Sequence, residues 1–383
     1  MKNRSNVYFI VYINMNASSD HFDTEIIPNI TYPDPYDTNI QTKTLHMDRG
    51  IYLMESLWRN EISSLSVDIK LSDNNSYNLL GLKELNTATL TLHQTINPHN
   101  SQNLITRPLV FGLGATQCLH AAIYACAEHC GKQLIVTAQL PGYLEYKNLI
   151  NIHHKGSAVW MDINKVLQLS DQSNVLEIVC SPNNPDGRIL HKITNSTYSI
   201  HDRINHWPFF THKTNDYFNE TFDNDQITIF SYPKILGFSA SRVGYAFVKH
   251  DHIATLMQKY IVYACHGLCT EGQLKCLTAL NYILKSPQHY MDMLSQYCTH
   301  RWDTFEKAIS HYNSSHTDII LLLNHQGPTA WIKLPSNSKQ WLLSKLNLVA
   351  TYGPEYGTTD DYARINLLSM PNEFNELIRR LYI

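Results

Sequence analysis

The sequence predicts an α/β protein with a three-layer α/β/α large domain, whose sheet is mostly parallel, and a smaller α+β domain. Between about residues 105 and 250, short apolar runs alternate with stretches of helical periodicity, which is typical of a parallel sheet with helices on both faces. Three further apolar runs near the C-terminus follow helical patterns and indicate a second sheet. With 383 residues, 43% of them hydrophobic, the chain can build two cores.

The N-terminal part shows little periodicity. The apolar run at residues 7–13 is too short to cross a membrane and no cleavage site follows it, so we expect a strand or an unstructured lead-in. Residues 31–37 (TYPDPYD) predict an extended, turn-rich arm. Helices are expected over 53–62 and 79–93, and the second ends before the loop INPHN.

Six short strands are expected in the large domain, each followed by a turn or a helix. In chain order they lie in LVFG, KQLIVTAQ, NVLEIVC, YSIHD, QITIFSY and GYAFVK. A helix rich in Ala and Cys follows the first. Ligands of open α/β sheets bind at the carboxyl ends of the strands, so the residues just after each run are the candidates for a site.

The second half of the chain begins with helical patterns. We expect one long helix over 253–282 and another over 287–310, followed by strands in DIILLL, TAWIKL and ARINLLS. The predicted large domain is 61–285 and the predicted small domain is 286–383. Residues 1–60 are expected to form an arm and part of the small domain.

Composition and charge narrow the possible partners. Charged residues make up 16% and the net charge is −3, which argues against a nucleic acid or an anionic membrane and favours a small molecule. The eight cysteines form no CxxC pair, although Cys126 and Cys130, like Cys265 and Cys269, are spaced to share a helix face. Buried thiols in a reducing, cytoplasmic compartment are expected, with metal ligation as the alternative.

Two cations stand in the otherwise apolar segment 230–248, where an unpaired charge would be costly. Lys234 follows the strand QITIFSY, and Arg242 precedes GYAFVK. Apolar surroundings can keep a lysine amine neutral and nucleophilic, and an arginine there can be compensated by a bound anion.

Polar residues at other strand ends complement these cations. Gly114, Ala115 and Thr116 begin a helix whose free N–H groups suit a phosphate, although a turn into a helix needs no ligand. Tyr143 follows the second strand, where its ring can stack on a ligand. Asn184 lies in the turn SPNNPDG, which presents its amide to a ligand or serves only as a turn.

Asp202 ends the strand YSIHD, and a buried carboxylate there needs a partner. Together these residues supply what an aldehyde cofactor with a phosphate and a basic ring nitrogen requires. Lys234 can form a Schiff base, and Asp202 can hold the proton of the ring nitrogen. Asn184 can contact the ring oxygen and the substrate, Tyr143 the ring face, and Arg242 the phosphate.

The order of these motifs resembles fold-type-I pyridoxal-phosphate enzymes of the aminotransferase class, and within them the alliinase and tryptophan-aminotransferase-related group. The matching motifs are GLGAT, PGY, SPNNPDG, HD, SYPK, SRVGYAFV and YARINLL. The resemblance spans about residues 45–380. It implies an aminotransferase-like fold, pyridoxal 5'-phosphate as cofactor and a free L-α-amino acid as substrate.

The resemblance also implies roles for single residues. Lys234 matches the Schiff-base lysine, and Ser231 and Arg242 match residues that bind the phosphate. Arg364 in YARINLL matches the arginine that binds the substrate's α-carboxylate with two hydrogen bonds. Tyr77 matches a tyrosine that reaches the phosphate of the neighbouring subunit, which implies a homodimer with shared active sites.

Three places depart from the family pattern. Where the family has D-x-x-Y-Y-W-P, this chain has DRINHWP, so Asn205 replaces a tyrosine that contacts the ring oxygen; a neutral replacement with the same geometry is the alternative. Pro233 replaces the serine before the lysine. A Gly-Asp-Pro segment that lies over the substrate is missing, although the Glu55 and Trp58 that follow it are present.

Two reactions fit these residues. An aminotransferase is the leading prediction, with Lys234 moving the substrate's α-proton. A β- or γ-elimination lyase, or an elimination-cyclisation enzyme, is the alternative, and the altered Asn205 and substrate-covering segment favour it. A non-catalytic cofactor-bearing protein is a third reading, opposed by the joint presence of Lys234, Asp202, Asn184, Arg242 and Arg364.

Overall fold

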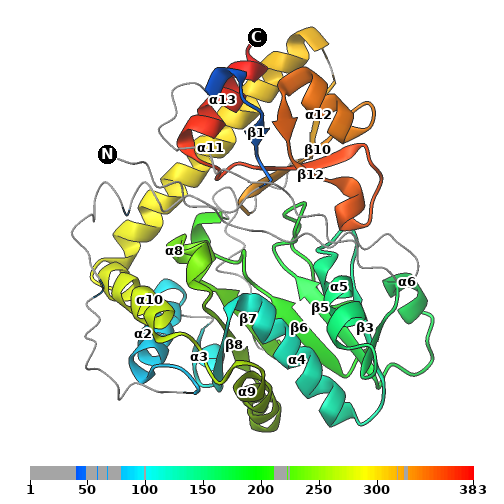
Figure 1. Ribbon diagram of the computed structural model, residues 1–383, viewed down its shortest axis with the longest axis vertical. Helices are drawn as coiled ribbons and strands as arrows, with labels where there is room; N and C mark the ends of the chain where they lie inside the picture. The colour runs from blue at the N-terminus through cyan, green and yellow to red at the C-terminus, as the bar shows by residue number, and fades with distance from the viewer. Residues whose placement is uncertain are drawn as a thin grey trace, which may run out of the picture.

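A seven-stranded sheet and a four-stranded sheet organise the computed structural model, in the lower and upper halves of Figure 1. The long helix α11 (Pro287–His316), drawn in yellow, runs from the first to the second. The structure describes residues 40–48, 58, 67, 79–98, 101–210, 222, 225–316, 318–322 and 327–383. The segments 7–13 and 31–37 lie outside these residues, and of the helix expected over 53–62 only Trp58, which is helical, is described.

The seven-stranded sheet has the order β2-β8-β7-β6-β5-β3-β4. Its strands are β2 (Leu109–Gly112), β3 (Leu134–Ala138), β4 (Ala158–Trp160), β5 (Val175–Cys180), β6 (Tyr198–Asp202), β7 (Ile227–Ser231) and β8 (Gly244–Val248). β7, β6, β5, β3 and β4 run parallel, and β8 runs antiparallel to both of its neighbours. A mostly parallel sheet is therefore confirmed. The unpredicted β4 is too short to show a period.

Helices cover both faces of this sheet and complete the three predicted layers. Ala246 and Val248 of β8 point into one core, and Tyr245 and Phe247 point into the other, because successive strand residues face opposite sides. Three helices pack into the first core: α4 (Gly114–Cys130), α5 (Glu145–His153) and α9 (Asp251–Cys265). The second core is filled by α2 (Lys83–Ile96), α10 (Thr270–Ile283) and part of α11.

The single helix expected over 253–282 is wrong, because α9 and α10 are separate. The chain breaks at His266 and Gly267, which have φ values of 52° and 99°, outside the helical range. A side chain at Gly267 would also press on the backbone of Leu79. Cys269 precedes α10, so it shares no helix with Cys265.

The four-stranded antiparallel sheet has the order β12-β13-β10-β9. Its strands are β9 (Ile320–Leu322), β10 (Thr329–Lys333), β12 (Thr351–Tyr352) and β13 (Tyr362–Asn366). The C-terminal part of α11 packs against it with α12 (Ser338–Leu346) and α13 (Pro371–Leu381). Near the N-terminus of the described chain, β1 (Leu45–His46) pairs in parallel with β11 (Leu348–Val349). The exact domain bounds stay a prediction.

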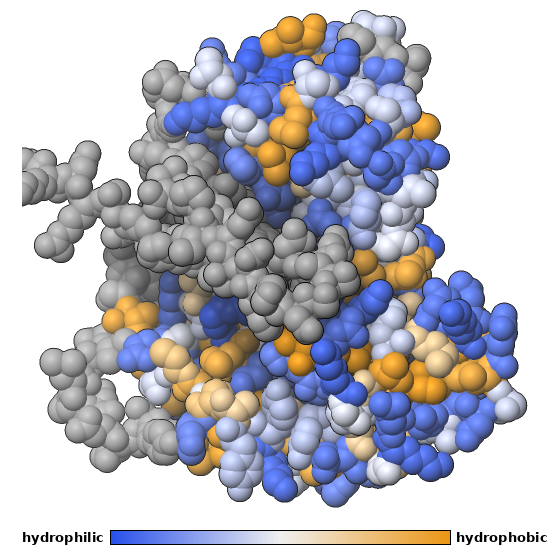
Figure 2. All heavy atoms as spheres, turned by 45° about the vertical axis from the view of Figure 1, so that its right-hand side comes forward, coloured by the Kyte–Doolittle hydropathy of each residue, from blue (hydrophilic) through white to orange (hydrophobic). Residues whose placement is uncertain are grey.

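Short elements complete the fold. They are η1 (Ile40–Thr42), α3 (Gln102–Ile105), α6 (Ile163–Val166), η2 (Pro208–Phe210), α8 (Tyr232–Leu236), η3 (Ser239–Ser241) and η4 (Gly353–Tyr356). On the face drawn in Figure 2, hydrophilic residues dominate and hydrophobic ones form separate patches. Within the part of the chain that the structure describes, no helix has both the length and the apolar character needed to cross a membrane.

Candidate active site

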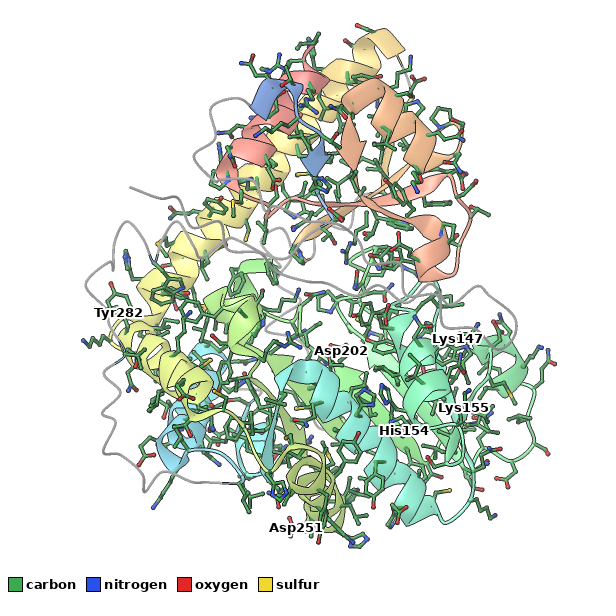
Figure 3. All side chains as sticks on the ribbon, viewed as in Figure 1. Lys147, His154, Lys155, Asp202, Asp251 and Tyr282 are labelled. Carbon is green, nitrogen blue, oxygen red and sulfur yellow. The ribbon has the colours of Figure 1, made fainter. Side chains whose placement is uncertain are left out.

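The carboxyl ends of β5, β6 and β7 lie next to one another. Cys180 at the end of β5 pairs with Asp202 at the end of β6, and Ser231 at the end of β7 pairs with Gly244 of β8. Figure 3 shows Asp202 at the edge of the large sheet that faces the small one. α8 starts immediately after Ser231 and carries Lys234 at this edge. The predicted site residues from three strands are thus brought together.

Lys234 has a lowered pKa of about 8, compared with 10.5 for an ordinary lysine. Burial is the main cause, and the positive charge of Arg364 adds to it, whereas Asp202 acts in the opposite direction. The preceding Pro233 lies in the first turn of α8, where a missing backbone N–H leaves no helical hydrogen bond unmade. Pro233 is therefore compatible with the position of the lysine.

Asp202 is only 7% exposed and accepts two hydrogen bonds. Its Oδ2 accepts from the hydroxyl of Tyr146 at 2.6 Å, and its Oδ1 accepts from the backbone N–H of Ile204 at 3.1 Å. Burial raises the pKa of Asp202, and these two donors and Lys234 oppose that rise. Sequence reasoning missed Tyr146. Its one signal is its position three residues after Tyr143, which places both tyrosines on one turn.

The N-terminus of α4 and Arg242 are packed against each other. Arg242 has a φ of 48°, and a Cβ atom added to Gly114 would lie 2.8 Å from its Nη2. A Cβ atom added to Gly244 would overlap the backbone nitrogen of Ala115. The glycines therefore allow β8 and the arginine to approach the free N–H groups of the helix, and Thr116 is exposed beside them. This donor set fits a phosphate.

Two buried polar residues have unused hydrogen-bonding capacity near these strand ends. Ser231 is 7% exposed and stands at the N-cap of α8, yet its side chain makes no capping bond. Asn205 is 6% exposed, and its Oδ1 has no hydrogen-bond partner. Rotating the amide would present Nδ2 at the same place. Unpaired buried polar groups are costly, so both residues fit a site that receives a polar ligand.

Arg364 on β13 joins the small sheet to the site. Its Nη1 donates to Oδ1 of Asn184 at 2.8 Å, and its guanidinium lies 5.4 Å from the ring centre of Tyr356. Its Nε has no hydrogen-bond partner. The Asn184 contact thus fixes one edge of the guanidinium and leaves donors for a carboxylate.

Tyr143 lies in the turn between β3 and α5, and the residue is 37% exposed. The ring packs edge-on against Tyr146, with 5.3 Å between the ring centres. Burial of the hydroxyl raises its pKa, and the charges of Glu145 and Asp202 raise it further. The backbone N–H of Gly142 donates to the carbonyl of Tyr356 at 3.0 Å, so this turn also contacts the small-sheet side.

Two residues named from the resemblance, Glu55 and Tyr77, lie outside the described residues. Trp58 is described, and it packs on the far end of α8. Its Nε1 donates to the carbonyl of Leu236 at 2.7 Å, and its ring centre lies 5.3 Å from that of Phe238. Trp58 therefore supports the helix that carries the lysine.

Comparisons with known proteins agree with this arrangement. A family model described as allinase matches residues 49–383. Tryptophan aminotransferase-related protein 3 of Arabidopsis thaliana is 26% identical over 332 residues, which cover 80% of this chain and 70% of that protein. Alliin lyase of Allium cepa var. aggregatum is 23% identical over 331 residues, which cover 78% of this chain and 71% of that protein.

Solved structures with the same fold include aminotransferases. A protein of Escherichia coli with methionine aminotransferase function superposes with a TM-score of 0.66 at 15% identity, covering 88% of this chain and 92% of the other. Aspartate aminotransferase of Thermotoga maritima gives a TM-score of 0.64 at 15% identity, covering 89% and 91%. At these identities the likeness establishes the fold.

Proposed function

The chain belongs to the allinase family and is a fold-type-I pyridoxal-phosphate enzyme, and within that family we propose that it is an aminotransferase for a free L-α-amino acid. The observation that carries the proposal is the setting of Lys234. Its amine has a pKa lowered to about 8 and interacts electrostatically with both Arg364 and Asp202. Such a group can act as a nucleophile and as a base near neutral pH.

The residues at the strand ends match the parts of the cofactor. Arg242, Ser231 and the first turn of α4 (Gly114, Ala115 and Thr116) would bind the phosphate. Asp202 would hold the proton of the ring nitrogen, Asn184 and Asn205 would contact the ring oxygen, and Tyr143 would cover the ring. The unpartnered Oδ1 of Asn205 and the uncapped Ser231 support this fit.

The cofactor, when bound, supplies an aldehyde for the amino group and a ring that withdraws electrons from the substrate's α-carbon. Arg364 would bind the α-carboxylate and so orient the Cα–H bond. Lys234 would take the α-proton and return it to the former aldehyde carbon. Asp202 would keep the ring nitrogen protonated during this transfer. Water would then hydrolyse the bond between the substrate carbon and nitrogen, which releases the keto acid and leaves the amino group on the cofactor, and a 2-oxo acid would accept that amino group.

A second candidate is elimination at the β- or γ-carbon, with or without ring closure. Asn205 favours it, because an amide in place of the family's tyrosine changes the hydrogen bond to the ring oxygen and with it the electron distribution of the ring. Alliin lyases are also among the relatives. Lys234, Asp202 and Arg364 would keep the same roles.

One experiment separates the two reactions. The holoenzyme is mixed with candidate amino acids without any 2-oxo acid, and product is counted per active site. An aminotransferase releases one equivalent of keto acid and loses its visible absorption, because no acceptor restores the cofactor. Continued product release without an acceptor contradicts transamination and supports elimination. Lys234→Ala abolishes both reactions, whereas Lys275→Ala, a neighbouring lysine placed over the ring of Phe238, retains them.

We further propose a homodimer in which Tyr77 of one copy reaches the phosphate site of the other, as the family resemblance implies. Two variants test this sharing: Lys234→Ala, which should be inactive, and Tyr77→Phe, which should bind the cofactor more weakly. Mixed dimers of the two contain one complete site, so mixing them after unfolding and reassembly should restore part of the activity. No restoration, or a monomer by sedimentation, contradicts shared sites.

A further inference from the structure

Tyr146 makes a short hydrogen bond to Asp202 of the site, yet no role follows for it from the motifs. It lies on α5 and is 1% exposed. Its hydroxyl donates to Oδ2 of Asp202 at 2.6 Å. This hydrogen bond is short and its acceptor is charged, which places it among the stronger kinds in proteins.

The helix that carries Tyr146 is fixed by its packing and by a contact to α4. Ile150 and His154 follow Tyr146 at intervals of four residues and are also buried, so α5 turns this one face to the core. Nε2 of His154 lies 3.1 Å from Nδ1 of His120, which is on α4. The helix that carries Tyr146 is thereby linked to the helix whose N-terminus is part of the phosphate site.

In this hydrogen bond the proton is on the Tyr146 oxygen and the Asp202 carboxylate is the acceptor. Burial and the charge of Asp202 raise the pKa of Tyr146 well above its ordinary value, so the phenol remains a donor. Burial alone would raise the pKa of Asp202, and the Tyr146 hydroxyl is the largest influence against that rise. The other groups around the carboxylate are Lys234, Arg203, Cys180, Tyr143 and the N–H of Ile204.

We propose that Tyr146 is a positioning residue that keeps Asp202 ionised and aimed at the ring nitrogen of the cofactor. The proposal rests on the assignment of Asp202 to that nitrogen, made above. Without the phenol, Asp202 becomes a stronger base and takes a larger share of the proton that it shares with the ring. The ring then loses positive charge, and the linkage between Lys234 and the cofactor holds its own proton to higher pH.

The test measures cofactor affinity and the pH at which the visible absorption band of the holoenzyme titrates. For Tyr146→Phe we expect about tenfold weaker cofactor binding and a titration moved to higher pH. Tyr198→Phe is the matched control. Tyr198 is a buried tyrosine at the opposite end of β6, and its hydroxyl bonds to Nδ1 of His129 at 3.0 Å. That variant should change neither quantity.

A second change avoids the loss of packing and serves if Tyr146→Phe does not fold. 3-Fluorotyrosine placed at position 146 is a more acidic and stronger donor, so the titration should move to lower pH. Unchanged titration and affinity in the Tyr146 variants, while Asp202→Asn shifts both, would overturn the role of Tyr146. If Asp202→Asn changes neither, the assignment of Asp202 itself fails, and with it that part of the proposed function.

Discussion

At the scale of single residues, the site holds a lysine with a lowered pKa, Lys234, and an arginine, Arg364. Burial and Arg364 lower the pKa of Lys234 to about 8, so a larger share of its amine is neutral near physiological pH than in an ordinary lysine. Arg364 is held by Asn184, whose Oδ1 accepts a hydrogen bond from Nη1 of the arginine. The lysine can therefore react with an aldehyde, while the arginine can bind a carboxylate.

The pH dependence of cofactor capture tests the state of Lys234. Only the neutral amine attacks an aldehyde, and a lowered pKa makes that form available at lower pH. The capture rate of the apoprotein should therefore rise with pH, reach half its maximum near pH 8 and then level off. Stopped-flow absorbance at a fixed cofactor concentration measures it. A rate that still rises steeply at pH 10 would indicate an ordinary lysine.

Arg364→Lys tests the carboxylate site. A lysine retains the charge but cannot offer two parallel N–H groups, so KM for the amino acid should rise about tenfold or more, with a smaller change in kcat. Arg379→Lys is the matched control, because Arg379 pairs with Glu376 at the surface of α13. Steady-state kinetics of both variants measure KM for the amino acid and kcat. Equal KM values would remove Arg364 from substrate binding.

At the scale of elements, the proposed phosphate site depends on the close approach of β8 to the N-terminus of α4. Gly244 has no room for a side chain beside Ala115, and Gly114 has none beside Arg242. The motif around Gly114 predicts a turn into a helix, and Gly244 falls in a predicted strand, but the reason why each position is a glycine appears only in the packing. This packing fixes where the free N–H groups of α4 point.

Gly244→Ala should therefore weaken both folding and cofactor binding. The added methyl group must push β8 away from α4, which we expect to cost about 1–3 kcal/mol in the free energy of unfolding. Gly156→Ala is the control, because a Cβ atom there meets no heavy atom within 4 Å. Denaturant unfolding and cofactor titration measure the two effects. Equal behaviour of the two variants contradicts the packing argument.

Several elements with a strong local signal were predicted, but not all of them. The strands β5 to β8 are short and buried along their whole length, and they were predicted at or within a residue or two of their bounds. The break between α9 and α10 was missed because the pattern is helical on both sides of it, and His266 and Gly267, which leave the helical φ range, lie at the break. α13 was also missed, although Pro371 marks its start and Phe374, Leu377 and Leu381 follow at helical spacing.

At the scale of the whole molecule, the site is assembled from two sheets. The Asn184–Arg364 bond joins residues 180 positions apart, and the hydroxyl of Thr329 on β10 lies 3.4 Å from the carbonyl of Pro185. Sequence motifs predicted the two partners of the first bond. They could not predict Tyr146, because its role arises from the packing of α5 on the large sheet and from no motif of its own.

The most direct test of the account is to locate the covalent attachment of the cofactor. The holoenzyme is reduced with borohydride, which makes the lysine–cofactor bond permanent, and is then digested and mapped by mass spectrometry. The label is expected on Lys234, at one per chain, and none is expected in the Lys234→Ala variant. Stoichiometric labelling of a different lysine, with Lys234 unmodified, would contradict it.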